Sequence, residues 1–259
     1  MTARRTQAII MAGGKGTRLL PYTALLPKPL MPIGDAPVME WLLRQLQAAG
    51  LTQIRVAVLH HRQLIQAYFG SGEQFGIDLR YEIEERPLGT CGSVARVLDH
   101  MTENFLLLNA DLVTDLDLAA LLSRHRTRGA DATVALQRHY VTQEFGVADL
   151  APDGAIQRLQ EKPSAEYHLV MGVYVLRREA IRPLLRAGER LDVPELLATM
   201  LERGMRVDGF ETDCLWLDIG RPDDYARAQS LAEEGVSAGK AEGVTPWMKA
   251  GAITRAACE

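Results

Sequence analysis

The sequence predicts an α/β fold in which a mostly parallel, mixed sheet carries helices on both faces, with a small antiparallel insertion. In the first half of the chain, short apolar runs typical of buried strands alternate with segments typical of amphipathic helices. In the second half, Pro152-Asp153-Gly154 separates two strand-like runs, which is the pattern of a hairpin. The chain has 259 residues, of which 47% are hydrophobic and 24% charged, so it can bury a full core.

Apolar and β-branched runs predict the strands. The first, residues 7–12, leads directly into a glycine-rich turn. Further strands are expected at residues 54–59, 79–83, 105–108, 132–136, 145–150, 155–159, 170–176 and 215–219.

Helical periodicity and end signals predict the helices. In residues 38–49 the apolar positions share one face, and Gly50 follows as a stop. Asp192 and Glu195 resemble a capping box that begins a helix ending near Arg203. Further helices are expected at residues 62–69, 117–127 and 222–234.

Two segments are expected to lack regular structure. Pro27, Pro29 and Pro32 prevent a regular helix in residues 21–37, which should form a surface loop. Residues 235–259 are rich in Ala and Gly with weak periodicity. We therefore expect one domain over residues 1–234, followed by a tail that is partly disordered or loosely helical.

Composition excludes several functional classes. A formal net charge of −4 argues against a nucleic-acid-binding surface. Apolar runs are too short to span a bilayer, so we expect no membrane association. The three cysteines, Cys91, Cys214 and Cys258, lie far apart without metal-ligand spacing, which favours a reduced, cytoplasmic location. The oligomeric state is open, and a homo-oligomer is compatible with the sequence.

The glycine-rich segment 13–18 follows the first strand directly. A strand that ends in such a turn presents backbone N–H groups as a concave site for phosphate oxygens. Thr17 adds a hydroxyl, and Lys15 and Arg18 add positive charge. The spacing differs from the Walker A loop and from the dinucleotide fingerprint. Taken alone, the segment is also compatible with a tight turn that binds nothing.

A lysine fixed between two prolines, Pro27-Lys28-Pro29, is the next signal. A stiff segment that carries one cation suits the aiming of charge at a fixed point. The alternative is a solvated surface lysine.

These motifs, together with later ones in the same order, resemble the sugar-1-phosphate nucleotidyltransferases, closest to the guanylyltransferase branch that uses mannose-, heptose- or glucosamine-1-phosphate. The resemblance extends over about residues 7–230. Its motifs are Ala12-Gly13-Gly14-Lys15-Gly16-Thr17-Arg18-Leu19, Pro27-Lys28-Pro29-Leu30, Pro87-Leu88-Gly89-Thr90, Asn109-Ala110-Asp111, Phe145-Gly146-Val147, Glu161-Lys162-Pro163, Gly172-Val173-Tyr174 and Trp216-Leu217-Asp218-Ile219-Gly220.

The resemblance implies a Rossmann-like fold whose antiparallel insertion serves the sugar side. It implies attack by a sugar-1-phosphate oxygen on the α-phosphate of a nucleoside triphosphate, with pyrophosphate as the leaving group. Catalysis would then rest on positioning and charge, without a covalent intermediate.

The resemblance also assigns roles to residues. Arg18 and Lys28 would contact the triphosphate, and Asp111 and Asp218 would hold Mg²⁺. The nucleotide would be bound by Ala12, Gly13, Gly14, Lys15, Gly16, Thr17, Glu84, Gly89 and Thr90. The sugar phosphate would be bound by Gly146, Glu161, Lys162 and Gly172.

Two of these assignments have alternatives on the residues alone. Asp218 lies between apolar neighbours, where a carboxylate needs a partner or a metal, but it could instead cap the helix after Pro222. Glu161-Lys162 could be an exposed charged pair after the hairpin.

Glu84 favours GTP as the nucleotide. A carboxylate only accepts hydrogen bonds, so it suits the N1–H and N2–H₂ donors of guanine, or the cytosine amino group, better than uracil or thymine. Glu84 could also point to solvent, which leaves CTP or UTP/dTTP, with a sugar or polyol phosphate, as alternatives.

The second substrate is less clearly specified. Relatives often carry Asn-Ala-Gly where this chain has Val170-Met171-Gly172, so an amide that could bind a hydroxyl is replaced by an apolar side chain. A cyclitol 1-phosphate therefore stands beside a sugar 1-phosphate as the expected acceptor. An inactive regulatory homologue is the rival of another class, and the presence of Arg18, Lys28, Asp111 and Asp218 argues against it.

Overall fold

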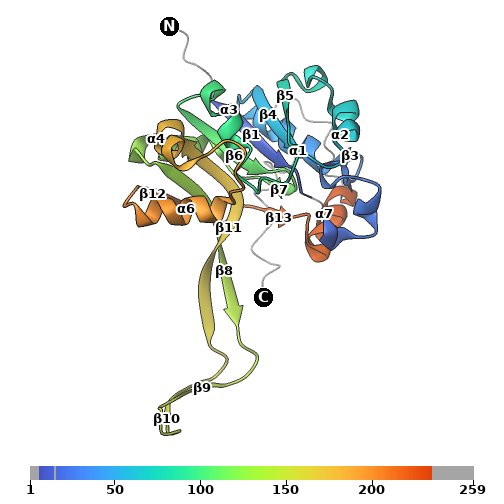
Figure 1. Cartoon of the computed structure of the whole chain (residues 1–259). Helices are drawn as coiled ribbons and strands as arrows, with labels where there is room; N and C mark the ends of the chain where they lie inside the picture. The colour runs from blue at the N-terminus through green and yellow to red at the C-terminus, as the bar shows by residue number, and fades with distance from the viewer. Residues whose placement is uncertain (1–5, 15, 235–259) are drawn as a thin grey trace.

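A computed structural model describes residues 6–14 and 16–234 and contains a seven-stranded sheet of order β12-β8-β11-β6-β1-β4-β5 (Figure 1). β11 pairs antiparallel with both neighbours, and the other six strands run parallel to one another. The strands are β1 (Gln7–Ala12), β4 (Gln53–Val58), β5 (Asp78–Ile83), β6 (Asn104–Asn109), β8 (Ala132–Thr142), β11 (Ser164–Arg177) and β12 (Val207–Thr212).

Helices cover both faces of this sheet, as expected. Successive residues of β1 point to opposite sides, so Ile10 joins one apolar core and Ile9 the other. The first core lies under α1 (Val38–Ala48), α2 (Arg62–Phe69) and α4 (Leu118–Arg128). The second lies under α3 (Val94–Val97), α5 (Arg178–Ile181) and α6 (Val193–Glu202).

A third apolar cluster attaches the C-terminal helix to the loop that follows β1. Ala228 of α7 (Pro222–Glu233) packs with Leu19, Met31 and Trp41. The short ladder of β7 (Leu112–Thr114) and β13 (Trp216–Asp218) adjoins this cluster. The end of the described chain is thereby held against the segment that carries Lys28.

Several predicted elements are confirmed and some differ. The capping box of Asp192 and Glu195 is present at the start of α6. The proline-rich segment is not a plain loop, because it contains two short 3-10 helices, Tyr22–Ala24 and Lys28–Leu30, and the strand pair of β2 (Pro32–Ile33) and β3 (Ala36–Pro37). The edge strand β12 was not expected, because its polar residues give no apolar run. The expected tail, residues 235–259, lies outside the described residues.

β8 and β11 are much longer than the apolar runs predicted. Beyond Leu136 and Val170 they continue as a two-stranded antiparallel ladder that leaves the body of the molecule (Figure 1). Its tip is a second small sheet of β9 (Val147–Leu150) and β10 (Ile156–Gln160). We call residues 137–170 the arm. The two strands of the tip were expected, but the ladder was not, because its polar and apolar residues are mixed and a ladder in solvent needs no continuous apolar face.

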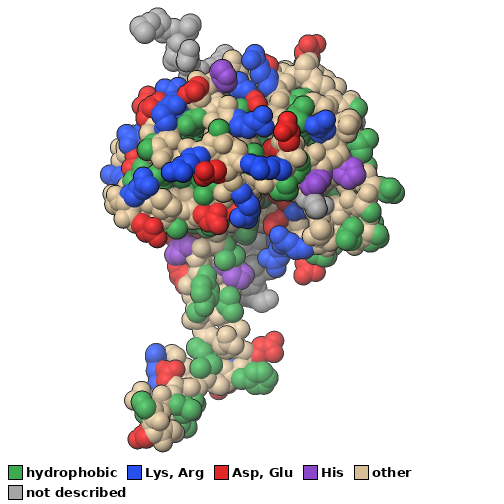
Figure 2. All heavy atoms as spheres, in the orientation of Figure 1, with side chains coloured by type: hydrophobic (Ala, Val, Ile, Leu, Met, Phe, Trp, Pro, Cys, Tyr) green, Lys and Arg blue, Asp and Glu red, His purple; other side chains and the backbone are tan. Residues whose placement is uncertain are grey.

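The arm leaves from the carboxyl edge of the sheet. β8 runs parallel to β6 through β11, so the end of β8 lies at the same edge as the ends of β1 and β6. Figure 2 shows hydrophobic side chains along the arm that no other element covers on the visible face. Within residues 6–14 and 16–234, no helix has both the length and the apolar character that a membrane span requires.

The buried His125 joins α4 to the sheet and predicts how folding stability depends on pH. Its Nδ1 lies 2.8 Å from Thr133 Oγ1 and its Nε2 lies 3.0 Å from Asn104 Oδ1. Burial, reinforced by Arg126 and Arg177, lowers the pKa of His125 below the ordinary value of 6.5. The unfolded chain therefore takes up this proton first, and stability is lost as the pH falls below 6.5.

We expect His125→Gln to flatten this dependence. Urea unfolding measured between pH 7.5 and about pH 5 should show a smaller loss of unfolding free energy in the variant than in the wild type. His100→Gln, at an exposed histidine, is the control and should keep the wild-type slope. Equal slopes in all three proteins would contradict this role for His125.

Candidate active site

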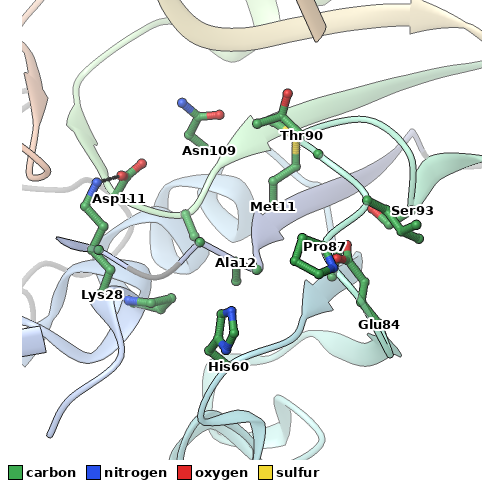
Figure 3. A pocket seen from close by; sticks show the side chains of 18 of the residues that line it. Met11, Ala12, Lys28, His60, Glu84, Pro87, Thr90, Ser93, Asn109 and Asp111 are labelled. Carbon is green, nitrogen blue, oxygen red and sulfur yellow. Dashed lines mark hydrogen bonds and ion pairs between the residues drawn. The ribbon is translucent and has the colours of Figure 1, made fainter. Parts of the chain in front are cut away.

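A cavity of about 490 Å³ lies at the carboxyl ends of β1, β4, β5 and β6 (Figure 3). This edge is where open α/β sheets bind ligands. The cavity is lined by Met11, Ala12, Gly13, Gly14, Gly16, Thr17, Arg18, Lys28, Pro29, Ala57, His60, Glu84, Pro87, Leu88, Gly89, Thr90, Ser93, Asn109, Ala110 and Asp111. The structure thus brings together the predicted nucleotide-side residues, except Lys15, which lies outside the described residues.

The glycine-rich turn owes its shape to Gly16. This residue has φ 66°, in the left-handed region that favours glycine. A Cβ added to it would lie 2.9 Å from Thr23 Cγ2, and the Thr23 hydroxyl donates a 2.7 Å hydrogen bond to the Gly16 carbonyl. The chain can therefore turn sharply after β1 and place Thr17 and Arg18 along the cavity.

Lys28 lies between two carboxylates. Its Nζ forms an ion pair with Asp111 Oδ2 and lies 3.6 Å from Asp218 Oδ1. The three side chains are only 14%, 17% and 27% exposed, respectively. Figure 3 shows the Lys28 side chain reaching Asp111 across the edge of the cavity. The surface-lysine alternative is therefore wrong.

The two carboxylates come together through the β7–β13 ladder. Asp111 directly precedes β7, in which Leu112 pairs with Asp218 in antiparallel register. The Ile219 amide donates a 2.9 Å hydrogen bond to the Asp111 carbonyl. Asp218 does not cap α7: its Oδ1 accepts a 2.8 Å hydrogen bond from the Gly220 amide.

Two converging carboxylates beside the cavity have the chemistry to hold Mg²⁺, which commonly takes one or two carboxylates and completes its shell with phosphate oxygens and water. Asp111 and Asp218 both reach one Nζ, so their oxygens face a common point. Among the described residues, no cluster of three or more His, Cys, Asp or Glu is placed to hold a metal. Two carboxylates would leave most coordination positions of such an ion to water and substrate oxygens.

Glu84 lies at the other end of the cavity and is buried, so the alternative in which it points to solvent is wrong. Burial raises the pKa of the Glu84 carboxyl, and hydrogen bonds from the Leu88 amide and the Ser93 hydroxyl partly oppose this rise. The Glu84 carboxylate also lies beneath the glycine-rich turn, because a Cβ added to Gly13 would lie 3.5 Å from Glu84 Oε2.

Gly89 and Thr90 attach this end of the cavity to α6. A Cβ on Gly89 would lie 2.5 Å from the Leu191 carbonyl oxygen, so only glycine permits this approach. The Thr90 amide donates a 2.8 Å hydrogen bond to Asp192 Oδ1, and the Thr90 hydroxyl accepts one of 2.8 Å from the Val193 amide. Both residues therefore hold the loop that forms the cavity wall.

The predicted sugar-side residues are not gathered in this cavity. Gly172, with φ 77°, lies against Asn109, where a Cβ would be 2.5 Å from Asn109 Nδ2. Gly146 and Glu161 lie together on the arm, since a Cβ on Gly146 would be 3.2 Å from Glu161 Oε2. Glu161 and Lys162 are exposed there, and their role in sugar binding stays a prediction.

Several further lining residues were given no role from the sequence, among them Met11, His60, Ser93 and Asn109. Met11 and Asn109 are register partners at the ends of adjacent strands, and His60 follows the end of β4. Position at the carboxyl end of a strand was the signal available for these three. Ser93 was hidden, because its contact with Glu84 depends on the fold of the intervening loop.

Comparison with known proteins agrees with the fold and shows the family. The family model described as nucleotidyl transferase matches residues 7–235. The UTP–glucose-1-phosphate uridylyltransferase of Synechocystis sp. is 32% identical over 86% of this chain, which spans 62% of that relative's length. The D-glycero-alpha-D-manno-heptose 1-phosphate guanylyltransferase of Aneurinibacillus thermoaerophilus is 31% identical over 86% of this chain and 96% of its own length.

Solved structures share the fold. A putative glucose-1-phosphate thymidylyltransferase from Bacillus anthracis, crystallised with sucrose, superposes with a TM-score of 0.73 at 24% identity, covering 91% of this chain and 98% of its own. HddC from Yersinia pseudotuberculosis superposes with a TM-score of 0.69 at 22% identity, covering 88% of this chain and 99% of its own. The family match covers nearly all of the described chain, and we conclude that this protein belongs to the nucleotidyl transferase family.

Proposed function

We propose that this chain transfers a nucleotidyl group from a nucleoside triphosphate, GTP in preference, to a sugar 1-phosphate or a cyclitol 1-phosphate. The observation that carries the proposal is the cluster of Lys28, Asp111 and Asp218 at the mouth of a cavity lined by the glycine-rich turn. Family membership supports the same reaction class. The relatives include a guanylyltransferase and a uridylyltransferase, so the preferred nucleotide base has to be inferred from the residues of the site.

In the proposed reaction, a phosphate oxygen of the 1-phosphate donates an electron pair to the α-phosphorus of the triphosphate. The bond from that phosphorus to the bridging oxygen breaks, its electron pair stays on that oxygen, and pyrophosphate leaves. Both reactants are anions, so the protein must align them and offset their repulsion.

Residues around the cavity divide this task. Gly13, Gly14 and Gly16 leave room for the phosphates, while Arg18 and Lys28 supply positive charge near the leaving group and the reacting phosphorus. Asp111 and Asp218 would hold Mg²⁺, which supplies further positive charge to the phosphate oxygens when bound. No side chain needs to bond covalently to the substrate.

GTP is favoured because Glu84 is an acceptor at the end of the cavity remote from Lys28. The carboxylate already accepts from the Leu88 amide and the Ser93 hydroxyl, and two oxygens offer about four acceptor positions. Acceptor capacity therefore remains for the N1–H and N2–H₂ groups of guanine. Uracil and thymine present a carbonyl oxygen where guanine presents its amino group, so they suit this wall less well.

The acceptor is expected to lack a polar group that a standard hexose presents at one position. Val170 is exposed at the root of the arm, at the position where relatives often carry the amide. An apolar side chain there suits a deoxy sugar or a cyclitol. Met171, by contrast, is buried in the core and contributes no side chain to a binding surface.

A matrix of nucleotides and 1-phosphates tests the proposal. GTP, CTP, UTP and dTTP would each be combined with hexose, deoxyhexose and cyclitol 1-phosphates, and pyrophosphate release measured with and without Mg²⁺. We expect Mg²⁺-dependent release with GTP above the other nucleotides. Failure of every combination would overturn the enzymatic function and favour an inactive regulatory homologue, and a clear preference for mannose 1-phosphate would overturn the cyclitol.

Gly220 offers a sharp test of the Lys28 position. A Cβ added there would lie 2.2 Å from Lys28 Nζ and 2.9 Å from Asp218 Oδ1, so Gly220→Ala must displace the lysine. We expect kcat to fall on the order of a hundredfold, as for the loss of one transition-state donor. Thermal unfolding of the variant should stay close to that of the wild type, and full activity would show that the Lys28 position does not matter.

Glu84 predicts a pH dependence of nucleotide binding. Its pKa lies above the ordinary 4.5, so acidification protonates it before a free Glu and removes an acceptor. The KM for GTP should therefore rise as the pH falls towards this pKa. Glu84→Gln should raise the KM about tenfold or more and lose the dependence. Glu85→Gln, at the exposed neighbour, should behave as the wild type, and an unchanged profile in Glu84→Gln would refute the role.

A further inference from the structure

The tip of the arm is an amphipathic sheet with an uncovered apolar face. Leu150 pairs with Ile156, and Ala148 pairs with Leu159. Cross-strand partners share a face and alternate residues of a strand share a face, so these four side chains lie on one side. Leu150, Ile156 and Leu159 are 63%, 65% and 73% exposed.

We expect this apolar face to be buried against another protein surface. A two-stranded hairpin is marginally stable in water, and a contiguous exposed apolar patch marks an interaction surface. The opposite face of the same strands carries the cross-strand partners Asp149 and Arg158, beside Val147 and Gln160, so the apolar side chains are concentrated on one face of the tip.

The same tip carries half of the proposed site. Glu161 follows β10 directly, Lys162 is its neighbour, and Gly146 packs against Glu161. The cavity that holds the nucleotide-side residues ends at Asp111 and contains no arm residue in its lining. If the proposed function is right, the site of the isolated chain is incomplete.

The body has a matching apolar surface beside the cavity. Between Arg18 and Lys28, the chain exposes Leu20, Tyr22, Leu25 and Leu26, and Leu25 is 80% exposed. We call these four residues the loop patch. Each half of the site is therefore bordered by an uncovered apolar surface of its own.

The arm is built to extend away from its own cavity. Seven consecutive residue pairs, Ser164↔Thr142 to Val170↔Leu136, form an unbroken ladder that spans about 20 Å. Polar contacts brace it: Arg138 forms an ion pair with Glu211 of the body, and His168 Nε2 lies 2.7 Å from Glu211 Oε2. A fold-back onto its own cavity would have to bend this ladder and break these contacts.

We propose that two copies of this chain exchange arms, so that each nucleotide cavity is completed by the partner's Glu161 and Lys162. The apolar face of one tip then packs on the loop patch of the other copy. The contact is made twice, by the same two surfaces, which is the closed arrangement of a two-fold dimer.

Light scattering after size-exclusion chromatography tests the interface. The wild type should have the mass of a dimer, while Leu159→Asp on the tip and Leu25→Asp on the loop patch should each have the mass of a monomer. Gln157→Glu adds charge to the same strand at the bulge, outside the apolar face, and should remain dimeric. A monomeric wild type, or dimeric Leu159→Asp and Leu25→Asp, would overturn the proposal.

Complementation tests the sharing of the site. Lys28→Ala destroys the cavity half and Lys162→Ala the arm half, so each variant alone should be inactive. A mixed dimer, co-expressed with two affinity tags and purified on both, contains one intact cavity facing one intact arm. Its turnover should therefore reach about half that of the wild-type dimer.

The outcomes separate this proposal from the proposed function. A mixed dimer without activity, beside an active wild type, would overturn the exchange and place each arm at its own cavity. If the wild type released no pyrophosphate with any substrate, yet Leu25→Asp and Leu159→Asp still dissociated it, the proposed function would fail and the arm interface would stand.

Discussion

The positive charge of Lys28, held between Asp111 and Asp218, is the interaction on which the arrangement of the site depends. It connects three segments distant in sequence: the proline-flanked loop, the end of β6, and β13 before α7. Partly buried charges cost desolvation energy, and replacing such a cluster by apolar residues often stabilises a fold. Its presence at the mouth of a cavity is therefore better explained by the handling of phosphate than by stability.

The surrounding architecture serves to keep these charges in place. The β7–β13 ladder fixes the separation of the two carboxylates, and the apolar cluster around Ala228 holds α7 against the loop that carries Lys28. At the opposite end, Gly89 and Thr90 attach the cavity wall to α6 through Asp192. The residues at the two ends of the cavity are thus held by contacts with helices α7 and α6.

Most strands of the sheet and most residues of the cavity could be predicted from the sequence. Buried parallel strands appear in the sequence as apolar runs. Their carboxyl ends all lie at one edge of the sheet, where Asp111 and the glycine-rich turn are found. Local patterns were therefore enough to place these residues at one cavity. The hairpin at the tip of the arm was expected, but its ladder could not be predicted in this way, because residues 137–142 and 164–169 mix polar and apolar side chains and give no continuous apolar run. The position of Glu161 and Lys162 far from the cavity depends on that pairing, and the contact between Ser93 and Glu84 depends on a loop with no periodic pattern.

The antiparallel strand β11 affects which parts of the chain can vary in length and sequence. Leu136 and Val170 are cross-strand partners, so the arm begins and ends about 5 Å apart. The segment between Thr142 and Ser164, which are also cross-strand partners, can lengthen or shorten without disturbing the contacts that Gln137, Arg138 and His168 make with β12. Each doubling of a flexible loop costs only about 0.6 kcal/mol. The tip of the arm is in this sense a replaceable module, which relatives could exchange while the strands of the main sheet keep their pairing.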